Sequence, residues 1–228
     1  MTEPVTSSTT GKRILVEAAV ENAAAAIAAE RAGVDRIELC QRLDIGGTTP
    51  SLEVIAEVLR QVRIPVHVMV RPRGGDFTYT NDEISLMMKD ISLIRSLGPA
   101  AIVTGVVGYD GEMHTVNVTR LVNAAHGLPV TFHRAFDSFA NPPTALEALI
   151  AVGARAVLTS GNGSSASAGM AAIAALERQA RNRIRIIAAG GVRAHNVREI
   201  VERTRVREIH ARFVSEEQMR ALVAAVRS

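Results

Sequence analysis

Carboxylates, imidazoles and one cysteine recur at alternate positions within short apolar runs of this sequence, and such side chains can move protons or bind a metal ion. The runs are rich in β-branched residues, which is typical of strands. Alternate side chains of a strand face opposite ways, so in a closed barrel the polar set is expected to face the interior. The residues expected there are Glu17, Glu38, Cys40, Arg71, His133 and His210.

Proton transfer is the chemistry that two carboxylates, two imidazoles and an arginine around one cavity could perform. His133 is one of the two residues in the set whose usual pKa lies nearest neutrality. Glu17 and Glu38 also have a purely structural alternative, a buried salt bridge with Arg71 or Arg73. We favour the functional interpretation, in which Glu17, Glu38, His133 and His210 are candidate catalytic residues.

In the run at residues 64–79, IPVHVMVRPRGGDFTY, an apolar strand is followed directly by the charged segment RPRGGD. Proline cannot extend a strand ladder, and the two glycines allow turns that other residues disfavour. Arg71, Arg73 and Asp76 are therefore expected where a buried strand emerges. The arginines there favour an anionic ligand.

Small residues follow two later strands, at 159–164 and 188–193. Such loops expose backbone N–H groups, and in α/β barrels the last loops often bind a phosphate or a carboxylate at a helix N-terminus. Ser160, Gly190 and Gly191 are therefore candidate ligand-binding residues. Ordinary tight turns are the structural alternative.

Strand and helix patterns alternate along the chain, and glycines such as Gly33 and Gly153 end a helix shortly before the next strand. The pattern predicts an α/β fold, a (β/α)₈ TIM barrel in a single domain. A doubly wound open sheet is the rival, but its usual Gly-x-Gly-x-x-Gly after the first strand is missing. Strands are expected at 14–20, 36–40, 66–71, 101–106, 130–133, 156–160, 185–189 and 208–211. Helices are expected at 22–32, 51–62, 81–97, 118–126, 142–152, 166–181, 195–203 and 216–226, with capping boxes at Thr80/Glu83 and Ser215/Gln218.

Composition restricts the class of protein. The chain has 228 residues, 47% of them apolar, and a net charge of only +3 with scattered basic residues. We therefore expect one domain at 13–228, no nucleic-acid partner and no membrane partner. Residues 1–12 are expected to form a disordered tail. The single cysteine excludes an intramolecular disulfide and suits the cytoplasm.

Several motifs together resemble those of the CutC family, in order from about Val16 to Arg212. They are RIELC at 36–40, GGTTPS at 46–51, RPRGGDF at 71–77, TFHRAFD at 131–137, LTSG at 158–161 and EIHA at 208–211. The resemblance implies a cytoplasmic (β/α)₈ barrel, often a homodimer, with a proposed role in copper homeostasis and copper ion binding. The family's motif residues at the barrel mouth fall on Glu17, Glu38, Cys40, Arg71, Arg73, Asp76, His133, Arg134, Asp137 and His210. The resemblance thus adds Asp137 to the candidate catalytic residues, and Arg71, Arg73, Asp76 and Arg134 are candidate ligand-binding residues.

One departure from the family pattern bears on copper. Family members proposed to bind copper carry Glu-x-Cys in the first strand, whereas this chain has Ala19 at the cysteine position. Cu(I) prefers thiolate or thioether ligands. Because residue 19 is alanine, a site with two thiolates cannot form there. Cys40, with His133 or His210, remains the candidate copper ligand.

Two functions therefore stay open. The first is a copper-homeostasis protein whose partner is Cu(I). The second is a barrel enzyme that acts on a small phosphorylated or carboxylated molecule through the Glu/His/Arg cavity.

Overall fold

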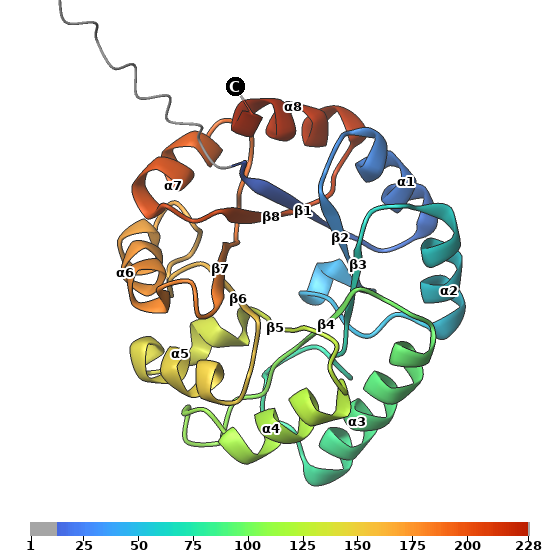
Figure 1. The fold of residues 1–228 in the computed structure, drawn as a ribbon, viewed down its shortest axis with the longest axis vertical. Coiled ribbons are helices and arrows are strands. Elements are labelled where there is room, and N and C mark those ends of the chain that lie inside the picture. The colour runs from blue at the N-terminus through green and yellow to red at the C-terminus, as the bar shows by residue number, and fades with distance from the viewer. Residues whose placement is uncertain (1–12, 228) are drawn as a thin grey trace, which may run out of the picture.

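The predicted barrel is confirmed by the computed structural model, which describes residues 13–227. Within that range, eight parallel strands pair in chain order and β8 closes onto β1 (Figure 1). The strands are β1 (Leu15–Val20), β2 (Arg36–Leu39), β3 (Val66–Met69), β4 (Ala101–Thr104), β5 (Val130–Phe132), β6 (Ala156–Thr159), β7 (Arg185–Ala188) and β8 (Glu208–Arg212). The tail predicted at 1–12 lies outside the described residues.

Helices surround the barrel, as Figure 1 shows. They are α1 (Ala23–Arg31), α2 (Leu52–Gln61), α3 (Asn81–Ser96), α4 (Thr115–Ala124), α5 (Pro142–Ala151), α6 (Met170–Ala180), α7 (Val197–Thr204) and α8 (Glu216–Arg227). Two short 3₁₀ helices, at Leu43–Ile45 and Arg134–Ser138, follow β2 and β5. Between residues 13 and 227, no helix combines the length and apolar character needed to cross a membrane.

The helix ends follow their local sequence. The capping box predicted at the start of α3 is present, since Thr80 N–H donates to Glu83 Oε2 (2.8 Å) and Glu83 N–H donates to Thr80 Oγ1 (3.2 Å). At α8, Gln218 N–H donates to Ser215 Oγ (3.2 Å). Helix α4 begins before the predicted residue 118, because the ring of His114 caps it by accepting from Asn117 N–H (3.3 Å). The sequence rules name Ser, Thr, Asp and Asn as caps, so this histidine was not recognised.

Helix α6 begins at Met170, although the sequence pattern extends back to residue 166. The backbone of Gly169 passes so close to Ser160 that an added Cβ would lie 1.8 Å from the Ser160 carbonyl oxygen. Residues 161–169 therefore form a compact loop over the end of β6, and this loop positions Ser160.

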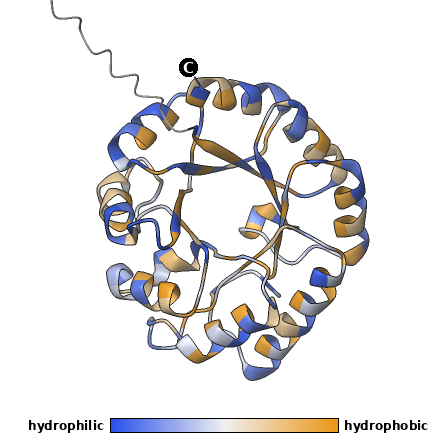
Figure 2. Cartoon of the chain, viewed as in Figure 1, coloured by the Kyte–Doolittle hydropathy of each residue, from blue (hydrophilic) through white to orange (hydrophobic). Residues whose placement is uncertain are grey.

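The predicted alternation of strand faces is also observed. Side chains such as Ile37 and Leu39 are fully buried in the main core between sheet and helices. Figure 2 shows hydrophobic colour along most of the barrel strands. Two separate apolar clusters come from the inward-facing positions: Ala156, Leu158, Ile187 and Ala189 form one, and Cys40, Met69 and Val103 form the other.

A buried ion-pair network fills the interior between β8, β1 and β2. Arg36 at the start of β2 pairs with Glu17 of β1, and its Nη2 lies 2.7 Å from Glu208 Oε2 of β8. All three residues are at most 6% exposed. Arg185 of β7 adds a contact to Glu208 at 3.3 Å. Arg36 is therefore the salt-bridge partner of Glu17, in place of the Arg71 or Arg73 considered from the sequence.

We predict that Arg36→Ala lowers the free energy of unfolding by about 3–5 kcal/mol, because it leaves Glu17 buried without its arginine and Glu208 with Arg185 alone. Urea unfolding followed by circular dichroism measures this. The matched control is Arg203→Ala in the exposed Arg203–Glu199 pair of α7, where a loss of at most about 1 kcal/mol is expected. Equal losses for the two variants would contradict the prediction.

Candidate functional site

A cavity of about 280 Å³ opens where the carboxyl ends of the strands meet. This is the end of a TIM barrel at which function is normally located. Six of the candidate residues line it: Glu38, His133, Arg134, Gly190, Gly191 and His210. Its other lining residues are Leu43, Gly46, Met69, Phe77, Leu158, Arg193, Ala211 and Arg212.

Glu17, His210 and Glu38 form a connected row from the interior toward this cavity. Their register explains the row, since Glu17 is opposite His210 in the β1–β8 pair and Glu38 lies on the neighbouring strand β2. Glu17 Oε1 lies 2.7 Å from His210 Nδ1, and His210 Nε2 lies 3.7 Å from Glu38 Oε2. The other oxygen of Glu38, Oε1, is buried and has no hydrogen-bond partner among residues 13–227.

The two carboxylates of the row differ in electrostatics. Burial alone would raise the pKa of Glu17, but Arg36, His210 and His67 outweigh it and hold that pKa well below its usual value. Burial raises the pKa of Glu38 to about 7, because the nearby Glu17 carboxylate adds to the effect and His210 and Arg36 only partly oppose it. Burial would lower the pKa of His210, yet Glu38 and Glu17 together raise it. Glu17 is therefore the fixed anion of the row.

His133 lies on the opposite wall of the cavity, just after β5. Its Nδ1 accepts a hydrogen bond from Ala135 N–H (3.2 Å), so the neutral ring carries its proton on Nε2. That Nε2 is buried and unpartnered within the described part of the chain. Burial, with the positive charge of Arg71, lowers the pKa of His133 to about 3. His133 is therefore a neutral hydrogen-bond donor.

Packing fixes the ring of His133. Phe77 lies against it with ring centroids 5.1 Å apart. On another side, a Cβ added to Gly105 would lie 2.7 Å from two atoms of the ring. A residue without a side chain is therefore required at 105.

Arg71, Arg73 and Asp76 do not line the cavity. Arg71 is buried and donates to the carbonyl oxygens of residues 45, 47 and 75 at 2.8–3.0 Å, and its guanidinium lies 4.7 Å from the ring centroid of Phe77. Arg73 pairs with Glu83 (2.6 Å) and with Asp76 (3.1 Å). The structure thus places these three in the β3–α3 loop, where Arg71 ties this loop to the β2–α2 loop and Arg73 and Asp76 hold its conformation.

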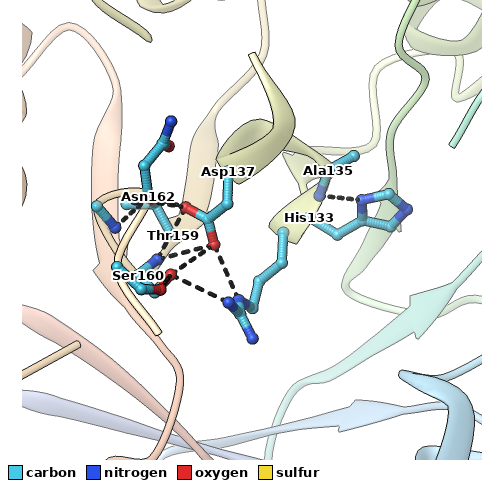
Figure 3. Close-up of polar contacts among 9 residues, drawn as sticks. His133, Ala135, Asp137, Thr159, Ser160 and Asn162 are labelled. Carbon is cyan, nitrogen blue, oxygen red and sulfur yellow. Dashed lines mark hydrogen bonds and ion pairs between the residues drawn. The ribbon is translucent and has the colours of Figure 1, made fainter. Parts of the chain in front are cut away.

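Asp137 and Ser160, labelled in Figure 3, form a second network with Arg134. The Asp137 carboxylate accepts from Ser160 N–H (3.0 Å), Ser160 Oγ–H (2.9 Å) and Thr159 Oγ1–H (2.5 Å). Arg134 donates from Nε to Asp137 (2.9 Å) and from Nη2 to Ser160 Oγ (3.0 Å). Asp137 and Ser160 therefore position Arg134, the member of this network that lines the cavity.

Two further arginines of the cavity rim, Arg193 and Arg212, were missed by the sequence reasoning. Arg212 continues the inward-facing alternation of Glu208 and His210 on β8, so one more step of that alternation would have found it. Arg193 follows Gly190 and Gly191 in the β7–α7 loop. Both glycines have positive φ, 98° and 70°, a conformation that favours glycine. Together with Arg134, these two residues give the rim three arginines.

Cys40 lies beneath the cavity in the apolar cluster with Met69. Its thiol is fully buried and donates a weak hydrogen bond to the carbonyl oxygen of Val20, with the sulfur 3.8 Å from that oxygen. Burial and the carboxylates of Glu38 and Glu21 raise the pKa of this thiol. The thiolate that copper binds is therefore disfavoured.

Glu17, Glu38 and His210 also form the one group of three His, Cys, Asp or Glu donors in the described residues whose ligand atoms lie close enough for one ion, within 4.8 Å of one another. Carboxylate oxygen and imidazole nitrogen are ligands for divalent transition metals. The row can therefore serve as a proton-transfer group or as a metal site.

We predict that His133 remains neutral from pH 8 down to pH 5, because burial and the charge of Arg71 hold its folded-state pKa at about 3, below the usual histidine value of 6.5. Nitrogen-15 NMR of labelled histidine should show one protonated and one unprotonated ring nitrogen throughout this range. The exposed His126 is the internal control in the same spectrum. A His133 signal that titrates near pH 6.5 would contradict the prediction.

The sequence and the structure were compared with those of known proteins. The CutC family profile matches residues 14–215. A family protein CutC of Glaesserella parasuis is 42% identical over 213 residues, which cover 93% of this chain and 87% of that protein. The human copper homeostasis protein cutC homolog is 44% identical over 196 residues, 86% of this chain and 72% of its own length. The crystal structure of the putative copper homeostasis protein CutC from Streptococcus agalactiae superposes with a TM-score of 0.82 at 37% identity, over 86% of this chain and 97% of that one. The chain therefore belongs to the CutC family.

Proposed function

We propose that this protein acts in copper homeostasis by binding a divalent metal ion, with copper(II) as the preferred ion, between Glu38 and His210. The observation that carries the proposal is the 3.7 Å separation of Glu38 Oε2 and His210 Nε2. That distance is too long for a hydrogen bond. A metal ion about 2.0–2.2 Å from each donor fits between them after a small adjustment.

Glu17 supports the proposal by orienting the histidine. The 2.7 Å contact from Glu17 Oε1 to His210 Nδ1 fixes the tautomer of the neutral ring, whose Nε2 lone pair is then directed toward Glu38 and becomes available when a metal ion displaces the proton of the charged ring. A carboxylate that holds the second nitrogen of a metal-binding histidine is a recurring arrangement in metalloproteins. Arg36 in turn holds Glu17 in place. The candidate site is therefore rigid before an ion arrives.

The choice of copper(II) rests on donor chemistry and on relatives. Sites of nitrogen and oxygen donors bind Cu²⁺ more tightly than the other divalent ions of its series. The human relative is named a copper homeostasis protein. Cu(I) at Cys40 is the competing site, and it has one buried thiol and no second cysteine, because residue 19 is alanine. The geometry supports Glu38 and His210 over Cys40.

We predict that Glu38→Gln weakens Cu(II) binding at least tenfold, because it removes the negative charge while keeping the shape of the side chain. Calorimetry with a competing chelator measures the affinity. Cys40→Ala is the discriminating variant and is expected to change the affinity less than twofold, and the exposed Glu57→Gln is the control. Loss of copper binding in Cys40→Ala alone would assign the ion to the thiol.

A second candidate function is an enzyme that acts on a small phosphorylated or carboxylated molecule. The unpartnered Nε2–H of His133 and the rim arginines favour it, since both suit an anion. Without a metal ion, Glu38 and His210 would be the proton-transfer groups. This function uses the same cavity.

We predict that a small anion raises the melting temperature of the protein, because a ligand that binds only the folded state stabilises it. A thermal-shift screen of sugar phosphates and organic acids tests this. Arg212→Gln should reduce any shift, whereas Arg60→Gln, on the outer surface of α2, should not. A screen without any stabilising compound would count against an anion site.

We further propose a cytoplasmic location and a homodimer that pairs through helix faces. The single, buried cysteine is compatible with a reducing compartment. Leu86 and Leu93, two turns apart on α3, are 47% and 41% exposed and provide an apolar surface that a second copy could cover.

A further inference from the structure

We propose that the cavity binds the metal ion together with a small carboxylate-bearing molecule, which completes the coordination of the ion and pairs with the rim arginines. This inference rests on the proposed metal site. The class of molecule is a hydroxy acid or an amino acid, because each offers a metal ion a carboxylate oxygen and a neighbouring hydroxyl or amino donor.

The size of the cavity is the first argument. Its volume is about 280 Å³, whereas a water molecule occupies about 30 Å³ in the liquid. Glu38 and His210 supply two donors at its wall, fewer than the roughly four to six that divalent transition metals take. The open positions of the ion would therefore face a space large enough for a small organic molecule.

Charge at the rim is the second argument. Arg193 Nη1 donates to the carbonyl oxygen of Val192 (2.7 Å) and Arg212 Nη1 donates to that of Leu43 (3.4 Å). Over residues 13–227, neither guanidinium forms an ion pair with a carboxylate. The rim thus carries positive charge that is not neutralised locally, and an anion in the cavity would neutralise it.

His133 provides the third and most specific argument. Its Nε2 carries a proton, lies in a residue that is only 3% exposed, and has no acceptor in the structure from residue 13 to 227. Buried donors almost always have an acceptor in proteins. Since the residue lines the cavity, we assign this acceptor to a carboxylate or hydroxyl oxygen of the bound molecule.

The apolar part of the cavity separates an organic acid from inorganic phosphate. Met69, Phe77 and Leu158 form an apolar part of the cavity wall. Inorganic phosphate has no apolar group to place there. A molecule with a short carbon skeleton covers this wall and keeps its carboxylate near the arginines, so the shape favours a hydroxy acid or amino acid.

The test is calorimetric titration of L-lactate, a small hydroxy acid, into the full chain without metal and after loading with Cu(II). We expect lactate to bind about tenfold more tightly to the copper-loaded protein, after correction for copper–lactate complexes in solution. By thermodynamic linkage, lactate must strengthen copper binding by the same factor. Inorganic phosphate, titrated in parallel, should show no such coupling.

Variants make the result specific. Arg212→Gln should reduce the affinity of the copper-loaded protein for lactate about tenfold. Arg203→Gln, on the exposed side of α7, is the control and should leave it within twofold. Equal lactate affinity with and without Cu(II), or coupling to phosphate instead of lactate, would overturn the inference while the metal site stands. Absence of Cu(II) binding would overturn the proposed function, and this inference with it.

Discussion

The interaction on which this structure depends is the buried contact between Arg36 and Glu17. It joins β2 to β1, and Arg36 also reaches Glu208 on β8, so one guanidinium links the three strands at which the barrel closes. The same Glu17 carboxylate holds Nδ1 of His210. Closure of the barrel and orientation of the cavity histidine therefore share one anion. Loss of the Arg36–Glu17 ion pair would therefore lower the stability of the fold and also change the orientation of His210.

The interior of the barrel is divided by chemistry. Strands β1, β2 and β8 contribute most of the charged groups, joined by Arg185 at the start of β7, whereas Ala156, Leu158, Ile187 and Ala189 of β6 and β7 form an apolar side. Because interior charges are tolerated only with partners, the charged side is arranged as a chain of contacts from Arg36 to Glu38. That chain ends in the unpartnered oxygen of Glu38 at the cavity. The apolar side needs no partners and closes by packing alone.

The alternation of strand side chains was sufficient to predict the barrel and to direct Glu38, His133 and His210 toward one cavity. The alternation did not predict the side-chain directions of residues at the strand ends. Arg36 and Arg212 occupy inward-facing positions, but an arginine at the end of a strand is usually taken to be exposed. The direction of Arg71 could not be predicted either, because its guanidinium binds carbonyls of two loops, the β2–α2 loop that turns at Gly46 and Gly47 and the β3–α3 loop that turns at Gly75, all with positive φ. Such loop conformations follow from contacts between distant segments, which spacing in the sequence does not contain.

Asymmetry of the cavity has a stereochemical consequence. One wall bears the carboxylate and imidazole of Glu38 and His210, another is apolar, and the rim is cationic. Three unlike contacts around one space distinguish a molecule from its mirror image, because exchanging two substituents at a tetrahedral carbon would place a charged group against Met69 or Leu158. A chiral compound that uses all three contacts would therefore bind more tightly in one hand than in the other.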